Sequence, residues 1–448
     1  MSFMTVHWGL LAKENVKPAR RRLTLDLGRA VMLYNEAAAP GLGGLWFIRQ
    51  AALALLGIRV ATEAQEAGSK IEISNAIEAL ACWIGYEHER WERGDWRLRG
   101  PRKLRVLQEA GKDRSFQVLT GTSAYVTQPM RMACVGALRG LGLVDADGSR
   151  YNSFSVNAKG QLLIDAVFGN GGPGQKNLQK SLRDWVNGRD VNFTPFLKRK
   201  LNPTSEAEEG ARKVMREAIG FMGDVGSGSN DAAARRRNAM AWMRRIDVED
   251  FGSNPHTDWD DRPLGIAVDH WQDMRAGAAL LQTRGAAIDV LLQIEQHLVL
   301  QPRINLARPL PEKILDALSA WRAQARSFQS LDSYGPREAA SAAEAFCAEA
   351  LQSDAAAITM LVKRENHMLR VTGGVVLPTA AWRSDAALAV YDGDVTEAET
   401  EDTVDGAPKR AERDLLPPYI SVRMIHLRRL TLDVDGRLGT YIQIQRQP

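Results

Sequence analysis

Apolar positions recur along much of the chain at the spacing of one face of an α-helix. After Asn75 they fall at i, i+3, i+4 and i+7, the repeat of an amphipathic helix. A later segment has the seven-residue repeat of a helix that packs lengthwise against another helix. The first group is Ile77, Leu80, Ala81 and Ile84, and the second is Ile314, Leu318, Trp321, Ala325 and Phe328.

The most apolar stretch of the chain, residues 45–60, predicts a buried core helix. It is interrupted by Arg49 and Gln50, and its uninterrupted part is 51–58. That part is far shorter than the roughly 20 residues a membrane-spanning helix needs. The N-terminal segment also lacks an apolar core long enough for a signal peptide. We therefore expect a cytoplasmic protein without a membrane partner.

The region after residue 352 changes character. A helix is predicted from Asp354, followed by a strand over 369–377. The stretch 391–408 is rich in acids and poor in apolar residues, which predicts a disordered loop. Alternating apolar residues over 430–434 and 441–444, on either side of an Asp-Gly turn, predict a closing β-hairpin.

Residues 115–168 have the predicted order helix, turn, helix, hairpin, helix. Thr127 is the expected cap of the second helix, and Gly140 begins the glycine signal that stops it. Two short strands then surround a polar turn at Asp147-Gly148. Asn157 opens the last helix of the segment.

The phrase ALRGLGLVDADGSRYNSFSVNAKG, residues 137–160, resembles winged helix-turn-helix domains. The resemblance covers about an eighth of the chain. It implies a recognition helix at 127–140 and a wing at 143–156, with double-stranded DNA as a candidate partner. The residues placed for DNA, all expected to be exposed, are Arg131, Arg139, Arg150 and Lys159.

Met130 and Met132 make the expected recognition helix unusually apolar for a groove-facing surface. They favour the alternative that this surface binds a protein. A second basic group, Arg235, Arg236 and Arg237, occupies a short predicted helix. Such a triplet is either a solvated helix face or a phosphate-binding group, so these residues are further DNA-binding candidates.

Together these patterns predict a mainly α, multi-domain fold, with helical bundles, an embedded winged helix and a small α+β C-terminal region. The predicted parts are an N-terminal helical region at 1–100, a winged-helix-like domain at 101–170, a helical connector at 171–250, a helical bundle at 251–352 and a mixed α/β region at 353–448.

Composition adds an arginine excess to this picture. Of the 58 basic residues 44 are Arg, while the net charge is only +4. Planar guanidinium groups suit phosphates and carboxylates, although a GC-rich genome gives the same excess. Three isolated cysteines exclude a disulfide framework and a CxxC zinc site, and they are typical of a reducing compartment. These are Cys82, Cys134 and Cys347.

Known catalytic motifs are absent from the sequence, which has no GxSxG elbow, HExxH, P-loop or kinase signature. The strongest polar cluster is His256, Asp258, Asp260 and Asp261, a set of groups able to bind a divalent metal. A loop of solvated acids is the alternative, which we favour because nothing fixes a ligand geometry. We expect no cofactor.

These patterns favour a non-enzymatic, DNA-associated or adaptor subunit of a bacterial multi-protein system, of the defence or mobile-element type. Several helical units around one winged helix suit a subunit that bridges protein partners. One alternative is a metal-dependent nuclease built on the Asp258 cluster. The other is a winged-helix transcriptional regulator with a helical effector domain.

Overall fold

A computed structural model of the chain describes residues 23–64, 68–92, 95–121, 123–169, 177–220, 229–246, 258–382 and 415–446. These parts are mainly helical, with small antiparallel sheets, as predicted. The acidic stretch 391–408 and His256 lie outside the described residues. Among the described helices, none is long and apolar enough to cross a membrane.

The first part of the chain forms packed helices and one small hairpin. Local capping explains where its longest helix begins, because Ser69 and Glu72 form a reciprocal capping box at the start of α3. The elements are α1 (Gly28–Ala38), α2 (Ile48–Glu63), α3 (Lys70–His88), α4 (Pro101–Glu109), α5 (Phe116–Leu119), α6 (Met130–Gly140), β1 (Val144–Ala146), the 3₁₀ turn η1 (Tyr151–Ser153), β2 (Phe154–Val156) and α7 (Ala158–Phe168).

The remaining elements are helices with a second small sheet. This sheet has the strand order β3-β5-β4, and both of its strand pairs are antiparallel. The elements are α8 (Leu178–Val186), α9 (Pro195–Leu201), α10 (Glu209–Ile219), α11 (Ser229–Arg245), α12 (Val268–Leu300), β3 (Ile304–Asn305), α13 (Glu312–Gln329), α14 (Arg337–Ala350), α15 (Asp354–Glu365), β4 (Leu369–Thr372), β5 (Val375–Pro378), α17 (Val422–Val434) and α18 (Leu438–Arg446).

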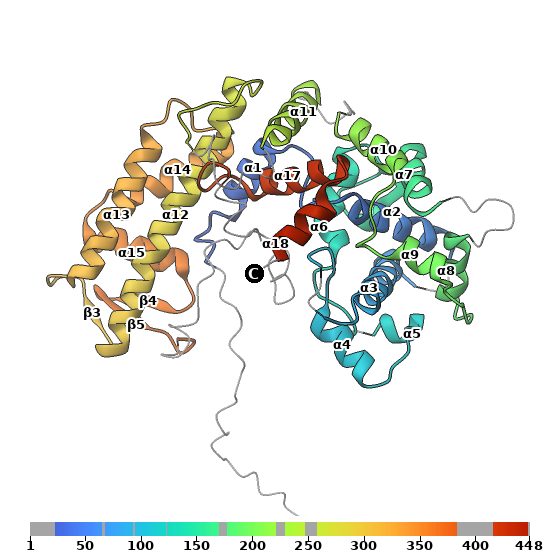
Figure 1. Cartoon of the computed structure of the whole chain (residues 1–448). Coiled ribbons are helices and arrows are strands. Elements are labelled where there is room, and N and C mark those ends of the chain that lie inside the picture. The colour runs from blue at the N-terminus through green and yellow to red at the C-terminus, as the bar shows by residue number, and fades with distance from the viewer. Residues whose placement is uncertain are drawn as a thin grey trace, which may run out of the picture.

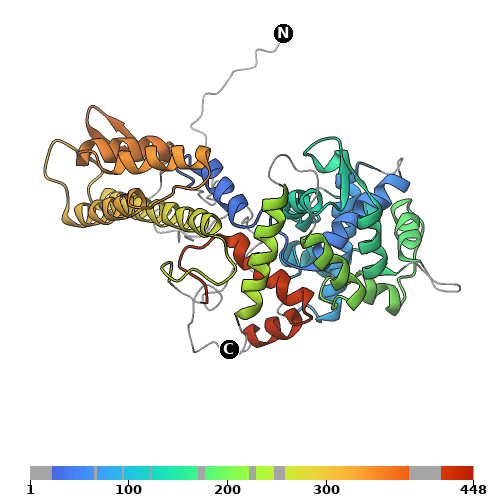
Figure 2. The same ribbon diagram turned by 90° about the horizontal axis from the view of Figure 1, so that it is seen from above.

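Buried side chains gather in two hydrophobic clusters, which correspond to the two lobes seen in Figure 1. The larger lobe is built on α2 to α11 with α17 and α18, and the smaller lobe on α13 to α15 with the second sheet. α1 and α12 contribute to both clusters, so they join the lobes. Figure 2 shows the smaller lobe extending away from the larger one as an elongated bundle.

Most of the predicted helices are confirmed. The apolar stretch 51–58 lies within α2 and is buried throughout. All four residues of the first apolar group are buried in α3, and all five residues of the heptad group are buried in α13, which packs along α12. The helix from Asp354 is α15.

Two strand predictions need correction. The strand expected over 369–377 is a hairpin, β4 and β5, because Gly373 and Gly374 both adopt positive φ and turn the chain. The closing hairpin expected around residue 435 is wrong. Those residues form α17 and α18, with Asp435 and Gly436 in the turn between the two helices.

Helix α17 is buried on nearly all sides, including two of its arginines. The guanidinium carbon of Arg429 lies 5.1 Å from the ring centroids of both Trp46 and Trp96. Four residues later, Asp433 accepts a hydrogen bond of 2.7 Å from the backbone N–H of Ile48, at the start of α2. A carboxylate at the N-terminus of a helix interacts favourably with the helix dipole, so Asp433 of α17 stabilises the start of α2.

Candidate functional site

The segment predicted to resemble a winged helix has its elements in the expected order: α5, α6, the β1–β2 hairpin and α7. The second helix begins at Met130 instead of Thr127, with Pro129 as its N-cap. Strands β1 and β2 pair antiparallel, with Val144 opposite Val156. At the following helix, the side chain of Asn157 accepts a hydrogen bond from Gly160 N, as predicted for an opening cap.

A buried carboxylate fixes the start of α6 to α3. Glu78 accepts hydrogen bonds from the backbone N–H groups of Met130, at 2.6 Å, and Arg131, at 3.1 Å. It also accepts one from the Tyr125 hydroxyl at 2.8 Å. Burial raises the pKa of Glu78, and these hydrogen bonds oppose the rise. The first turn of α6 is therefore held inside the larger lobe.

Arg131 occupies this buried first turn, and the expectation that it is exposed is wrong. Arg131 is only 7% exposed. The Arg131 Nε donates to Asn75 Oδ1 at 2.6 Å, and its guanidinium carbon lies 5.1 Å from the Tyr151 ring centroid. Burial lowers the pKa of Arg131, against the opposing effects of Tyr151 and Glu78. Arg131 thus joins α3, α6 and the hairpin.

The hairpin also packs on the larger lobe. The Tyr151 hydroxyl donates to the Ala54 carbonyl at 2.5 Å and lies 3.0 Å from Ser74 Oγ. Lys70 Nζ donates to the carbonyls of Asn152 and Phe154. These contacts hold the hairpin against α2 and α3, while Arg150 at its tip stays exposed.

The Arg235–Arg237 triplet on α11 is mostly packed and not a solvated face. Arg236 is buried, and it donates to the carbonyls of Ile219 at 2.9 Å and Pro40 at 3.0 Å. Arg235 forms ion pairs with acids of α12. Only Arg237 is exposed, and its Cδ would lie 3.6 Å from a Cβ added at Gly220, where α10 ends.

Contacts around Gly41 bring the end of α6 close to the middle of α11 and the end of α10. A Cβ added at Gly140 would lie 2.5 Å from the Gly41 carbonyl oxygen, so the end of α6 contacts this loop directly. Gly41 is also beside Arg236 of α11, which binds the end of α10. Two positions after Gly142 the chain enters the hairpin, and Gly160 of α7 packs on Leu143.

Three cations of the predicted set lie on these elements, and we call them the junction cations: Arg139 in the last turn of α6, Lys159 in the first turn of α7 and Arg237 in the middle of α11. Arg139 and Arg237 are exposed, and Lys159 is half-buried. Burial lowers the pKa of Lys159, and Glu217 of α10 opposes this effect. The fold therefore links elements whose cations are up to about 100 residues apart in the sequence.

The acidic cluster considered for metal binding is described from Asp258 onward, and these residues lie in a surface loop. Asp258, Asp260 and Asp261 are exposed. Asp260 Oδ1 lies 3.2 Å from Arg275 Nη2, an ion pair. Within the described ranges, no three His, Cys, Asp or Glu side chains are grouped so as to hold a metal ion.

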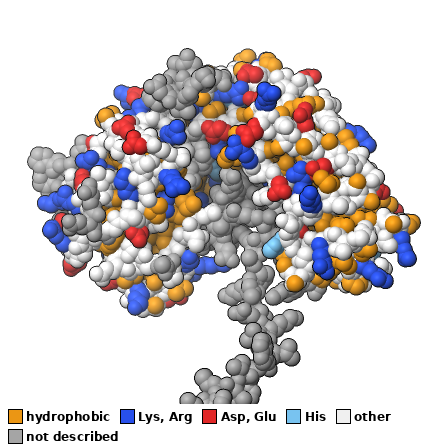
Figure 3. All heavy atoms as spheres, turned by 180° about the vertical axis from the view of Figure 1, so that it is seen from behind, with side chains coloured by type: hydrophobic (Ala, Val, Ile, Leu, Met, Phe, Trp, Pro, Cys, Tyr) orange, Lys and Arg blue, Asp and Glu red, His pale blue; other side chains and the backbone are white. Residues whose placement is uncertain are grey.

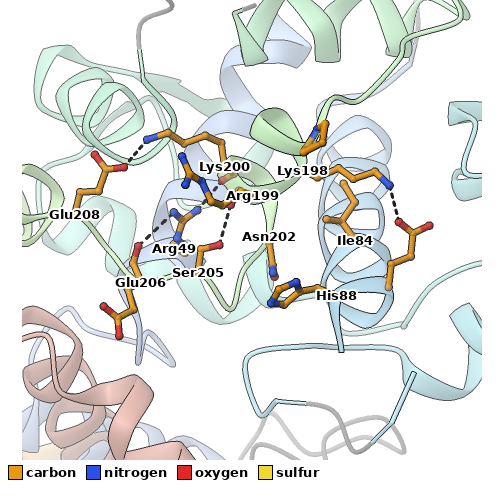
Figure 4. A pocket seen from close by; sticks show the side chains of 12 residues that line it. Arg49, Ile84, His88, Lys198, Arg199, Lys200, Asn202, Ser205, Glu206 and Glu208 are labelled. Atoms are coloured by element: carbon orange, nitrogen blue, oxygen red, sulfur yellow. Dashed lines mark hydrogen bonds and ion pairs between the residues drawn. The ribbon is translucent and has the colours of Figure 1, made fainter. Parts of the chain in front are cut away.

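A pocket that the sequence patterns did not indicate opens between α3, α9 and the segment that follows α9. It is a cavity of about 800 Å³. Figure 4 shows Arg49, Arg199 and Lys200 gathered on one side of it, with Ile84 of α3 across from them. The Lys198–Lys200 run is visible in the sequence, but Arg49 belongs to an apolar stretch, and only the fold brings the two together.

On the face seen in Figure 3, cationic side chains are dispersed. In Figure 3, Lys and Arg side chains are scattered among acidic and apolar ones on both lobes. The three cysteines are buried, and burial raises the pKa of each thiol, which keeps it protonated.

Comparisons with protein families, with curated proteins and with solved structures found no significant match. The function proposed below therefore rests on the chemistry of the described residues.

Proposed function

We propose that this protein is a non-catalytic, DNA-associated adaptor subunit that contacts the phosphates of duplex DNA through the junction cations Arg139, Lys159 and Arg237. The observation that supports the proposal is that these cations lie on elements joined by close contacts: the end of α6 beside Gly41, the start of α7 on Leu143, and the middle of α11 beside Gly41 and the end of α10. Lys159 lies in the first turn of α7, where the helix dipole adds to the attraction for an anion.

This mode of binding is independent of base sequence. In winged helix-turn-helix domains the first turn of the recognition helix reaches the base edges. Here the first turn of α6 is occupied by its contacts with Glu78 and Asn75, so Arg131 is not available to read bases. Phosphate contacts supply affinity and orientation, and they carry no direct sequence information.

The test is the salt dependence of DNA affinity. Each neutralised phosphate contributes about −0.9 to the slope of log K against log salt. The triple variant R139A/K159A/R237A should weaken binding to a fluorescent duplex and reduce the magnitude of the slope by about 2 to 3.

A charge-matched control is available in the smaller lobe, where three exposed cations, Arg303, Arg308 and Lys313, lie far from the junction along the chain. The variant R303A/R308A/K313A should keep the wild-type affinity and slope. If both triple variants bind DNA alike, the junction is not the DNA contact.

Protein binding by α6 is the second candidate, and Met132 favours it. Met132 is 49% exposed, and it shares the solvent-facing side of α6 with Gly136. Met130 cannot serve in this role, because it is buried. Met132→Asp should leave the melting temperature unchanged and remove a stoichiometric partner that co-purifies with the wild type and with the control Arg303→Ala. An unchanged set of partners would contradict this candidate.

The nuclease alternative gains no support from the described acids, since Asp260 is paired with Arg275 and the cluster is exposed. The transcriptional regulator and the bacterial defence or mobile-element setting stay predictions of the sequence patterns.

A further inference from the structure

The pocket beside α9 has the size of a small-molecule site. Its volume of about 800 Å³ falls within the roughly 300–1,000 Å³ that is usual for ligand pockets. Ile84 and Pro195 give it apolar surface, and Asn202 and Ser205 give it amide and hydroxyl groups. It uses none of the junction cations.

Arg49 places a buried positive charge at this pocket. The residue is 4% exposed, and its Nη1 donates to the Lys200 carbonyl at 2.6 Å, while its Nη2 lies 3.5 Å from the Glu206 carbonyl. Among the described residues, no carboxylate is within ion-pair distance of Arg49, and its Nε has no hydrogen-bond acceptor. Burial lowers the pKa of Arg49 to about 10, which reflects a charge short of compensation.

Arg199 adds a second guanidinium group without a carboxylate partner among the described residues. It is exposed, and its guanidinium carbon lies 5.9 Å from the Phe196 ring centroid. The two lysines beside it differ, because each forms an ion pair: Lys198 with Glu87 at 3.0 Å, and Lys200 with Glu208 at 2.5 Å. Among the described residues of the lining, these two guanidinium groups therefore form no ion pair with an acid, although the nearby Glu208 and Asp433 favour the charged form of Arg49.

We propose that this pocket binds a small phosphoryl-bearing anion. Guanidinium groups donate paired hydrogen bonds to phosphate oxygens and keep their charge at all physiological pH values. A bound phosphate would supply the anionic partner that Arg49 lacks. The cavity exceeds the size of one phosphate, so it leaves room for an organic group beside Ile84 and Pro195.

Inorganic pyrophosphate is the probe, measured by isothermal titration calorimetry on the full chain at fixed ionic strength. The wild type should bind it, and the double variant K198A/R199A should bind at least about tenfold more weakly, since each lost charge-assisted hydrogen bond is worth about one factor of ten or more. DNA affinity should stay unchanged in this variant.

The matched control is K180A/R189A, which removes the same charge from exposed positions outside the pocket. It should keep the wild-type affinity for pyrophosphate. Absence of binding by the wild type, or an equal loss in both double variants, would overturn the proposal.

Arg49→Gln tests the buried group directly. Its amide can still donate to a backbone carbonyl, so folding is expected to persist while pyrophosphate binding falls at least about tenfold. Pyrophosphate should raise the melting temperature of the wild type and not that of this variant. Undiminished binding by folded Arg49→Gln would also overturn the proposal, and if the variant fails to fold, K198A/R199A decides.

Discussion

At the scale of single residues, buried polar groups determine how the elements of the larger lobe are joined. Glu78 satisfies three donors that would otherwise be buried without an acceptor, two of them at the start of α6. Arg131 and Arg49 likewise donate hydrogen bonds to groups brought from distant parts of the chain. Their burial could not be predicted from the sequence, because arginine is usually exposed and nothing local indicates the partner.

Replacing Glu78 should be costly. Glu78→Ala leaves the Tyr125 hydroxyl and two backbone N–H groups without an acceptor and creates a cavity, so we expect a loss of about 2–4 kcal/mol in the free energy of unfolding. Urea denaturation measures it. On the same helix, Glu72→Ala removes only half of an exposed capping box and should cost about 0.5–1 kcal/mol. Equal losses would contradict the role given to Glu78.

His270 makes stability depend on pH. It is fully buried, its Nε2 lies 2.8 Å from the Ala38 carbonyl, and its Nδ1 has no hydrogen-bond partner in the part of the chain that the structure describes. Burial lowers the pKa of His270 below the value of 6.5 that an unfolded chain gives. The folded state then binds fewer protons than the unfolded state below about pH 6.5, so stability is lost as pH falls through that value.

His270→Gln should remove this component, because glutamine can donate to Ala38 without titrating. Below about pH 6.5 the free energy of unfolding should fall less steeply in the variant, by up to about 1.4 kcal/mol per pH unit. Denaturation at several pH values gives both curves, and parallel curves would show that His270 is not the titrating group.

At the scale of elements, prediction succeeded where a helix has an apolar face or an uninterrupted apolar run, and it failed at α17, where buried arginines interrupt the apolar pattern. The heptad group of α13 faces α12 and leaves polar residues outside, so its period is visible. Helix α17 is buried from Leu427 to Val434, including Arg428 and Arg429. In the sequence these arginines resemble solvent-exposed positions. The alternating apolar residues around the Asp-Gly pair then match the pattern of a β-hairpin.

Two glycines of α6 should respond oppositely to alanine. Gly140→Ala places a Cβ 2.5 Å from the Gly41 backbone and should destabilise the protein by about 1–3 kcal/mol. Gly136→Ala meets nothing closer than 4.0 Å on the exposed side of the helix and should stabilise it by about 0.5–1 kcal/mol. Thermal unfolding of the two variants tests the contact between α6 and the Gly41 loop. A loss of stability in both variants would contradict the prediction.

At the scale of the whole molecule, α1, α11 and α12 hold the two lobes together. Arg235 of α11 contacts Asp273 at 2.5 Å and Asp269 at 2.7 Å, both on α12, and the carbonyl of Ala37 on α1. Tyr34 of α1 donates to the Tyr334 carbonyl in the smaller lobe at 2.6 Å. None of these partners is adjacent in the sequence, so the junction could be recognised only in the folded chain.

Arg235→Ala should loosen this junction. Its side chain and that of Asp273 are largely buried, and breaking such a pair leaves an uncompensated charge, at a cost of about 3–5 kcal/mol. Hydrogen exchange in α1 and in the first turns of α12 should accelerate. Arg275→Ala removes the exposed pair with Asp260 and should cost less than about 1 kcal/mol. Similar costs and similar exchange would indicate that Arg235 does not join the lobes.

Helices α17 and α18 belong to the hydrophobic core of the larger lobe, and this has a consequence for synthesis on the ribosome. Domains generally fold in the order in which they emerge, the N-terminal one first. Here α1 packs against the later helices α14 and α17, and the start of α2 is bound by Asp433 of α17. The nascent chain must therefore keep apolar helices uncovered until α17 has been translated, which makes it a natural client for chaperones that hold unfinished chains.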